Sequence, residues 1–234
     1  EIACLESVDK LDSLLRHMGK ELDINIVGVE GYTILHMACA KNDVDMVKTI
    51  LYYGEDRLDV NKVNDDRCTT LHIACSKGYT DIVKVLLSRD DVDVNASDKG
   101  GFTPLHLVKT TEMANLLLSY PHMRVDVNKK NKDGAVPLKV ICSLGKVDLV
   151  NMILYYPYAK VHINEGDNED YTPLHVACGK GDIEIVKALM AYSDEKLNLD
   201  AISKDGITAL HAACSAGNAD LVKFLFKSVN EGKK

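Results

Sequence analysis

The apolar residues of segment 167–202 predict two short helices separated by a break. The positions that recur at helical spacing are Leu174, Ala177 and Cys178 in the first run and Ile183, Val186, Leu189 and Met190 in the second. Thr172 is placed to cap the first helix, and Pro173 suits its first turn because no amide hydrogen is missed there. Gly181 in the break accepts the left-handed conformation that ends a helix. We therefore expect a pair of helices followed by a long link.

The same pattern returns along the chain at a nearly constant period. The tetrapeptide Thr-Pro-Leu-His stands at 103–106 and 172–175, and altered copies stand at 33–36, 69–72, 136–139 and 208–211. The copies end at 36, 72, 106, 139, 175 and 211, in steps of 36, 34, 33, 36 and 36. Such a period is typical of helical repeat arrays, in which each repeat stacks only on its neighbours. The pattern predicts an all-α fold and favours binding over catalysis.

Three further motifs accompany the tetrapeptide. The segment 98–102 (Asp-Lys-Gly-Gly-Phe) precedes one copy, 81–87 (Asp-Ile-Val-Lys-Val-Leu-Leu) follows another, and Asp-Val-Asn closes repeats at 59–61, 93–95 and 126–128. With these motifs the chain resembles the ankyrin repeat family. The resemblance implies an all-α ankyrin-repeat solenoid of stacked helix-turn-helix units with β-turn fingers.

The period divides the chain into repeats of one elongated domain. We expect a degenerate N-terminal repeat or cap at 1–27 and ankyrin repeats at about 28–63, 64–97, 98–130, 131–166, 167–202 and 203–234. The chain begins with Glu1 rather than Met, which favours a piece of a longer protein. The last helix, around 221–226, is apolar like an internal one, although a closing repeat is usually polar outside. We expect the array to continue, or another domain to cover this end.

Composition narrows the functional classes. With 28 basic and 35 acidic residues the net charge is −7, which argues against a general nucleic-acid binder. The chain contains no run of 18 apolar residues, so we expect no membrane insertion. Gly-rich phosphate loops, His-Glu-x-x-His and Gly-x-Ser-x-Gly are absent from the sequence, and we expect neither an enzyme nor a cofactor. The isolated chain is predicted to be a monomer.

Five of the seven cysteines share one repeat position. Cys39, Cys75, Cys142, Cys178 and Cys214 each lie three residues after the end of the tetrapeptide, and no Cys-x-x-Cys pair exists. We predict buried, reduced thiols rather than disulfides or metal ligands, and hence an intracellular protein of the cytosol or nucleus.

Five histidines also share one position, the last of the tetrapeptide. They are His36, His72, His106, His175 and His211. The resemblance implies that this His and the preceding Thr join a hydrogen-bond network between adjacent repeats. We therefore assign them a structural role rather than a catalytic or metal-binding one.

Two repeats depart from the pattern. In the third, the Gly-containing turn between helices is missing, so 108–112 is predicted to form a shorter bend. In the fourth, Val136 and Lys139 replace Thr and His. Because coupling between neighbours sets cooperativity in such arrays, we predict a soft point near 106–140, with faster hydrogen exchange than in flanking repeats.

The finger glycine is also lost twice. Arg67 and Asp170 stand where Gly31, Gly101 and Gly134 stand in other repeats. Since a left-handed conformation is costly for these residues, the sequence favours another turn type at both fingers over retained strain.

The resemblance implies partner binding through finger tips and the concave face of the first helices. The tip candidates are Asp65, Asp66, Arg67, Lys99, Phe102, Lys132, Asp133, Ala135, Asn168, Glu169, Tyr171, Lys204, Asp205 and Ile207. The first-helix candidates are Lys41, Ser76, Lys77, Ser143, Leu144, Lys180 and Ala216. Lys129, Lys130 and Lys132 make one finger basic, whereas Glu165, Asp167, Glu169 and Asp170 make the next acidic. This contrast predicts either a mixed-charge partner groove or a merely solvated surface.

Three alternatives remain at this stage. The chain is either a module for a separate partner protein or a structural or regulatory arm of a larger channel, kinase, receptor or effector. The tyrosine-rich links 52–57, 120–124 and 155–160 either pack a helix end onto the next repeat or contribute to an interface. Asn95, with Leu87 eight residues upstream, resembles a substrate of the asparaginyl hydroxylase that modifies ankyrin repeats, or else stabilises its loop.

Overall fold

The computed structural model describes residues 13, 16–17 and 23–231. The chain divides into two compact units, residues 1–125 (unit 1) and 126–234 (unit 2), which are described separately. Most of the predicted degenerate repeat at 1–27 lies outside the described residues. The boundary between the units falls inside the predicted soft segment 106–140, whose softness remains a prediction.

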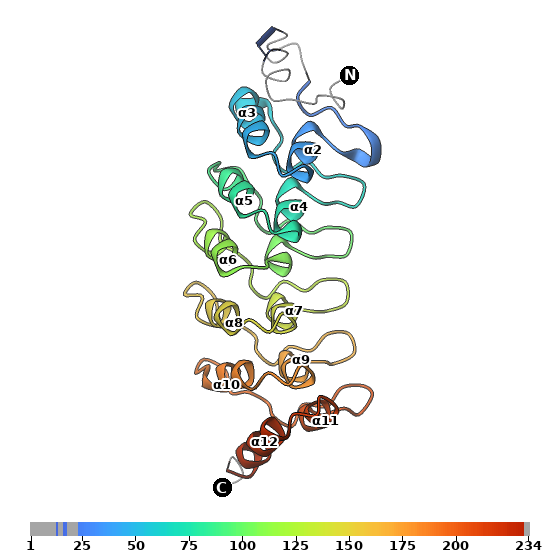
Figure 1. Cartoon of the computed structure of the whole chain (residues 1–234), viewed down its shortest axis with the longest axis vertical. Coiled ribbons are helices and arrows are strands. Elements are labelled where there is room, and N and C mark those ends of the chain that lie inside the picture. Colours follow the sequence, from blue (N-terminus) through green and yellow to red (C-terminus); the bar gives the residue numbers. More distant parts are fainter. Residues whose placement is uncertain (1–12, 14–15, 18–22, 232–234) are drawn as a thin grey trace. The chain divides into compact units, whose positions relative to one another are not determined.

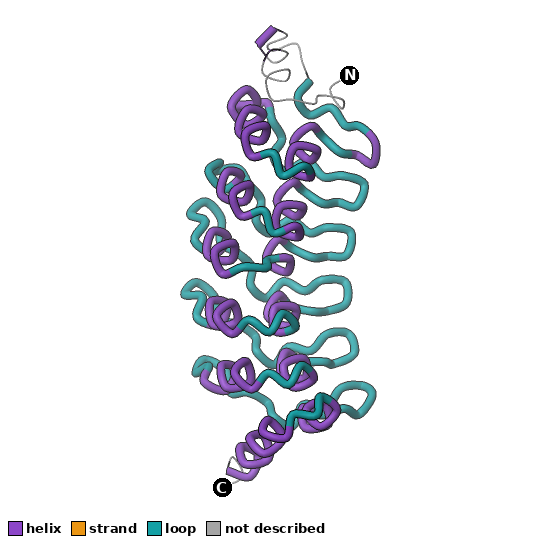
Figure 2. The backbone as a smooth tube through the Cα atoms, in the orientation of Figure 1, coloured by secondary structure: helices purple, strands orange, loops and turns teal. Residues whose placement is uncertain are grey.

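Unit 1 stacks three successive repeats. Its elements are η3 (Val29–Gly31), α2 (Ile34–Ala40), α3 (Val44–Gly54), η4 (Glu55–Arg57), α4 (Thr70–Lys77), α5 (Thr80–Leu86), η5 (Pro104–Leu107) and α6 (Thr111–Leu118). The first helices α2, α4 and η5 pack in one row, and the second helices α3, α5 and α6 pack in another. Finger loops project beyond the row of first helices (Figures 1 and 2).

Unit 2 repeats this arrangement. Its helices are α7 (Pro137–Cys142), α8 (Val147–Leu154), α9 (Pro173–Gly179), α10 (Ile183–Ala191), α11 (Ala209–Ser215) and α12 (Ala219–Glu231). The first helices α7, α9 and α11 stack in order, and each packs on the second helix of its own repeat. Regular structure in the described part of the chain is helical, with isolated β-bridges at Val27–Thr33 and Ile202–Thr208. The expected all-α fold with β-turn fingers is confirmed.

The tetrapeptide both starts each first helix and fills the core. Thr69 precedes α4 and accepts a hydrogen bond from the amide of His72, whose ring in turn accepts from the Thr69 amide. The leucine between them, Leu71, is at most 2% exposed, as are Leu105 and Leu174. Burying one such leucine contributes about 1.5–3 kcal/mol. The motif thus fixes where a helix begins and which face it buries.

The third repeat is shortened as predicted. Its first helix is only the 3₁₀ turn η5, after which Val108 is extended with φ −61° and ψ 140°. Thr110 then caps α6, because its hydroxyl oxygen accepts from the amide of Met113 at 3.2 Å. One hydroxyl cap replaces the missing glycine turn.

The prediction of a different turn at the two glycine-free fingers is wrong. Arg67 and Asp170 have φ of 58° and 60°, close to the 80° of Gly101 and the 77° of Gly134. The surrounding hydrogen bonds hold the turn: the Arg67 amide donates to the Asn64 carbonyl at 2.8 Å, and the Asp170 amide donates to the Asp167 carbonyl at 2.9 Å. Both residues therefore retain a left-handed conformation that costs about 1–2 kcal/mol for a residue with a Cβ.

The cysteine prediction holds at four of five positions. Cys39, Cys75, Cys142 and Cys178 are buried free thiols, and burial raises the pKa of Cys39, Cys142 and Cys178 to about 12. They remain protonated and pack as small apolar side chains. Cys214 is exposed, contrary to the prediction, because no first helix among the described residues stacks on the far side of α11.

Candidate functional site

Five of the six described fingers are closed by one short polar side chain at their start, whereas the first finger has Gly28 at that place. The Oδ1 of Asp98 accepts from the amides of Gly100 and Phe102 at 2.8 Å, and the Oδ1 of Asp167 accepts from those of Glu169 and Tyr171 at 3.0 and 2.9 Å. The equivalent residues in the remaining three of these fingers are Asn64, Asn131 and Ser203. These bonds shape the tip before any partner is present.

Backbone hydrogen bonds then join adjacent tips within each unit. In unit 1 the Lys99 amide donates to the Asp66 carbonyl at 2.7 Å, and in unit 2 the Lys204 amide donates to the Glu169 carbonyl at 3.0 Å. The approach is so close that a Cβ at Gly134 would lie 2.8 Å from the backbone nitrogen of Asn168. Neighbouring tips in one unit thus form a connected strip.

Most predicted tip residues are accessible on these strips. The exposed ones are Asp65, Asp66, Arg67, Lys99, Lys132, Asp133, Asn168, Glu169, Lys204 and Asp205, and the half-buried ones are Phe102, Tyr171 and Ile207. Ala135 is 5% exposed, so its prediction as a tip contact is wrong. It packs at the finger base, since its amide bonds to the Asn131 side chain.

The predicted first-helix residues flank the strips. Lys41, Lys77, Ser143, Leu144, Lys180 and Ala216 are exposed, and Ser76 is half-buried with its hydroxyl donating to the Ile73 carbonyl at 3.0 Å. In each unit the exposed ends of the first helices and the finger tips offer side chains of both charges.

Phe102 and Tyr171 have a structural contact that the sequence did not reveal. Their rings lie 5.6 Å from those of His106 and His175, edge to face, and Tyr32 contacts His36 at the same distance. Each aromatic ring contacts the histidine of its own repeat and is itself half-buried.

His36, His72 and His175 bridge repeats as predicted, whereas the exposed His211 bonds to Thr208 of its own repeat. The Nδ1 of His72 accepts from the Thr69 amide at 3.2 Å, so its Nε2 carries the proton and donates to the carbonyls of Ala96 and Phe102. Burial lowers the pKa of His36 and His72 below 6.5, against the opposing effect of their carbonyl partners. The neutral ring is therefore the form built into the fold.

In the fourth repeat an ion pair occupies the corresponding place. The Nζ of Lys139 donates to the Oδ2 of Asp167 on the next finger, with the two side chains only 16% and 14% exposed. Burial tends to raise the pKa of Asp167, but bonds from Lys139 and from the amides of Tyr171 and Glu169 outweigh it and lower the pKa. The sequence showed the loss of His at 139 but not this replacement.

The predicted contrast between a basic and an acidic finger is partly neutralised. Lys130 pairs with Glu165, and Lys139 pairs with Asp167, so neither acid faces solvent unpaired. Lys132 and Glu169 keep exposed side chains on adjacent tips. Together with the exposed Asp170 on the second tip, these two residues carry what remains of the contrast.

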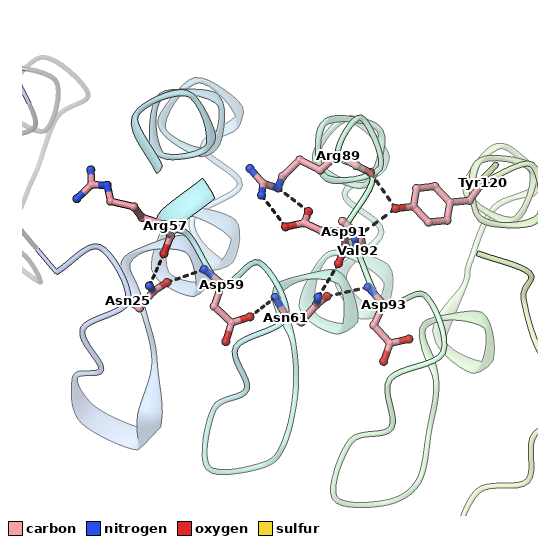
Figure 3. Close-up of polar contacts among 9 residues, drawn as sticks. All are labelled: Asn25, Arg57, Asp59, Asn61, Arg89, Asp91, Val92, Asp93 and Tyr120. Atoms are coloured by element: carbon pink, nitrogen blue, oxygen red, sulfur yellow. Dashed lines mark hydrogen bonds and ion pairs between the residues drawn. The ribbon is translucent and has the colours of Figure 1, made fainter. Parts of the chain in front are cut away.

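Asparagines form a second ladder at the bases of the fingers (Figure 3). Asn61 donates to the Asp91 carbonyl and accepts from the Asp93 amide, both at 2.7 Å, and Asn25 makes the same pair of bonds to Arg57 and Asp59. Asn95, Asn128 and Asn164 continue the pattern. Asn25 and Asn164 were not predicted, although Asp-Ile-Asn and His-Ile-Asn preserve the Asp-Val-Asn spacing. Hydroxylation of Asn95 stays a prediction.

Tyr120 packs on the repeat before it, so the first of the two alternatives for its link, packing onto the next repeat, is wrong there. The Tyr120 hydroxyl donates to the Arg89 carbonyl at 2.8 Å and accepts from the Val92 amide at 3.2 Å, which places it on the preceding repeat (Figure 3). Tyr192 likewise accepts from the Val161 amide at 3.0 Å. The hydroxyls of Tyr120 and Tyr192 thus stabilise the backbone of the link in the preceding repeat.

No described helix combines the length and apolar character needed to cross a membrane. No group of three or more His, Cys, Asp or Glu side chains in the described ranges is arranged to hold a metal ion.

Comparison with known proteins agrees with the fold. A family model described as "Ankyrin repeats (3 copies)" matches residues 2–98, 35–131, 108–201 and 140–234. The structure is similar to the human ASB11 ankyrin repeat domain, with 25% identity and a TM-score of 0.71 over 94% of this chain and 91% of that one. It is also similar to the ankyrin repeat domain of Bcl-3, a member of the IkappaB protein family, with 22% identity and a TM-score of 0.69 over 92% and 91%. No curated protein sequence matches significantly.

Proposed function

Because the chain belongs to the ankyrin repeat family, a non-catalytic fold whose arrays generally bind proteins, we propose that it binds a partner protein through its finger strips and the exposed ends of its first helices. The observation that carries this proposal is the connected strip of tips, where preformed turns hold exposed side chains of both charges. A preorganised surface loses little conformational freedom on binding.

Mixed charge suits a protein partner of complementary pattern. In unit 1 the Nζ of Lys99 lies 3.9 Å from the Oδ1 of Asp66 on the adjacent tip. In unit 2 Lys132 and Glu169 occupy adjacent tips. Charges at the rim of an interface mainly set orientation and association rate. We therefore expect the affinity for the partner to fall with added salt.

The test is affinity capture with two matched baits. One carries Asp66→Lys, Lys99→Glu, Lys132→Glu and Glu169→Lys on the tips, and the other carries Asp45→Lys, Lys48→Glu, Glu184→Lys and Lys187→Glu on second helices. Both sets of changes keep the net charge at −7. The second set reverses each ion pair within α3 and α10, so opposite charges stay paired there. A protein retained by the native chain and the second bait, and lost from the first, supports the finger site. Equal retention on both baits contradicts it.

A second candidate role is an arm that packs inside a larger assembly. The observation in its favour is Phe226, which is 62% exposed on α12 although apolar. Phe226→Ser would then weaken the assembly while leaving the capture experiment unchanged. The buried free thiols support a reducing compartment, cytosol or nucleus, for either role.

A further inference from the structure

A groove lies between two links of unit 2. These links follow α8 and α10, at the end of the helix pairs away from the fingers (Figure 1). It has a volume of about 410 Å³ and is lined by residues 154–160, after α8, and 192–194, after α10. Four of its ten lining residues are tyrosines, and the finger site uses none of them. The groove therefore needs its own explanation.

The tyrosines form two supported pairs. Tyr155 and Tyr158 are 60% and 59% exposed, whereas Tyr156 and Tyr192 are buried. The Tyr155 ring lies 6.4 Å from that of Tyr192, and the Tyr158 ring lies 5.4 Å from that of Tyr156, both edge to face. Each exposed ring thus rests on a buried one, an arrangement that limits its motion and leaves aromatic surface open to solvent.

The polar groups of the groove are also fixed. The Tyr192 hydroxyl accepts from the Val161 amide at 3.0 Å and lies 3.3 Å from the Asp194 carboxylate. Lys160 and Asp194, on different links, are the only charged residues among the ten that line the groove, so the lining is neutral overall. A long highly charged ligand is a poor match for such a lining, and a mostly uncharged one with an occasional charge is a good match.

A proline-rich segment in the polyproline II conformation has this chemistry. Its rings are apolar, its carbonyls have no internal hydrogen bonds, and its prolines lack amide donors. Flat tyrosine rings with hydroxyl donors complement both properties, and aromatic-lined grooves are a general means of recognising such segments. We propose that the groove of residues 154–160 and 192–194 binds a proline-rich extended segment of a partner protein, with a basic residue of that segment against Asp194.

Binding is measured with two synthetic peptides by fluorescence polarisation. Each has a single arginine at one end and about nine residues in all, so that the proline version extends roughly 28 Å. The second peptide has alanine in place of every proline. We expect saturable binding of the proline peptide and at least about tenfold weaker binding of the alanine peptide, since the ordered conformation is lost.

Three variants locate the site. Tyr155→Ala with Tyr158→Ala is expected to weaken the proline peptide about tenfold or more, because buried aromatic contacts dominate such interfaces. Asp194→Asn is expected to weaken binding of the proline peptide but not of a third peptide in which its arginine is replaced by alanine. Tyr52→Ala removes a tyrosine that is 73% exposed in unit 1, outside the groove, and is expected to change nothing.

Several results overturn the proposal. Equal binding of the two peptides does so, as does proline-peptide binding that survives the paired tyrosine change. If that variant loses its helical circular dichroism, Tyr155→Phe with Tyr158→Phe replaces it, and unchanged affinity there counts against the hydroxyl donors. The four charge changes on the finger tips leave peptide binding intact, which keeps this test separate from that of the proposed function.

Discussion

The repeats that begin at Thr69 and at Val136 solve the same stacking problem with different chemistry. In the first, a neutral His72 joins its own cap to the Phe102 carbonyl of the next repeat. In the second, Val136 offers no polar side chain, and Lys139 reaches the Asp167 carboxylate of the next finger. In both repeats the fourth residue of the tetrapeptide reaches the next finger, through an imidazole in one and an ammonium ion in the other.

Removing His72 and removing Lys139 leave different polar groups without a hydrogen-bond partner. The imidazole satisfies one amide and two carbonyls, all near the core. The ammonium ion satisfies one carboxylate that also accepts two backbone amides. Leaving a buried polar group without a hydrogen-bond partner costs more free energy than losing a contact that water can replace. We therefore expect the loss of His72 to destabilise the protein more than the loss of Lys139.

The largest expected effect is that of His72→Ala. We expect a loss of about 2–4 kcal/mol in the free energy of unfolding, because a buried ring and its three polar bonds disappear together. Urea unfolding and hydrogen exchange of α4 amides measure it. His211→Ala is the matched control, since His211 makes the same cap but is exposed; its expected loss is about 1 kcal/mol. Similar losses for the two variants would contradict the bridging role.

Lys139→Met ranks next. We expect the free energy of unfolding to fall by about 1–3 kcal/mol. This is less than for breaking a fully buried ion pair, because Asp167 keeps its two backbone donors. Lys130→Met is the control, whose pair with Glu165 is 47% and 37% exposed and for which a loss below about 1 kcal/mol is expected. If the Lys130 variant were as unstable as the Lys139 variant, the difference expected between the exposed and the buried ion pair would be contradicted.

Acidification sharpens the comparison further. Because the native pKa of His36 and His72 lies below 6.5, the unfolded chain binds protons first, and stability falls as pH drops through 6.5. Each histidine contributes at most about 1.4 kcal/mol per pH unit in that window. The Lys139–Asp167 pair responds only below pH 3.8, since the Asp167 pKa is lowered from that value. Urea midpoints at pH 7.5 and 5.5 that are equal, or higher at 5.5, would refute the histidine effect.

The smallest expected effect comes from restoring the finger glycine. Arg67→Gly should stabilise unit 1 by about 0.5–1 kcal/mol, since the relief of left-handed strain exceeds the added flexibility of the unfolded chain. Gly101→Arg, at the same turn position one repeat later, should destabilise by about 1–2 kcal/mol. Thermal midpoints report both. Destabilisation by Arg67→Gly would mean that the arginine side chain stabilises the finger by more than the strain costs.

The sequence predicted the fold well because the fold depends on local, periodic signals. Thr and His at fixed spacing specified caps and bridges, and the shortened third repeat was visible as a missing glycine. The errors arose where the outcome depends on neighbours. Arg67 keeps its turn because its amide bonds to Asn64 and the adjacent finger bonds to the same turn. Ala135 is buried at the base of its own finger. Cys214 is exposed because no first helix among the described residues stacks beyond α11.

The candidate site was predicted less completely for the same reason. Most tip residues are accessible as expected, but pairing across fingers, such as Lys130 with Glu165, cannot be read from spacing along one chain. The groove of residues 154–160 and 192–194 arises from two links that are more than thirty residues apart, and only the tyrosines of the first link were noted in advance.

The bonds that join adjacent tips have an evolutionary consequence. At Lys99 and Lys204 the backbone contact to the neighbouring finger uses the main-chain amide, which every amino acid except proline provides, and the lysine side chain adds a second contact to that finger. Mutation can therefore rewrite the chemical character of these positions, one finger at a time, without disturbing the stack beneath. Diversification of the outer surface and inheritance of the scaffold proceed on separate parts of the same residue.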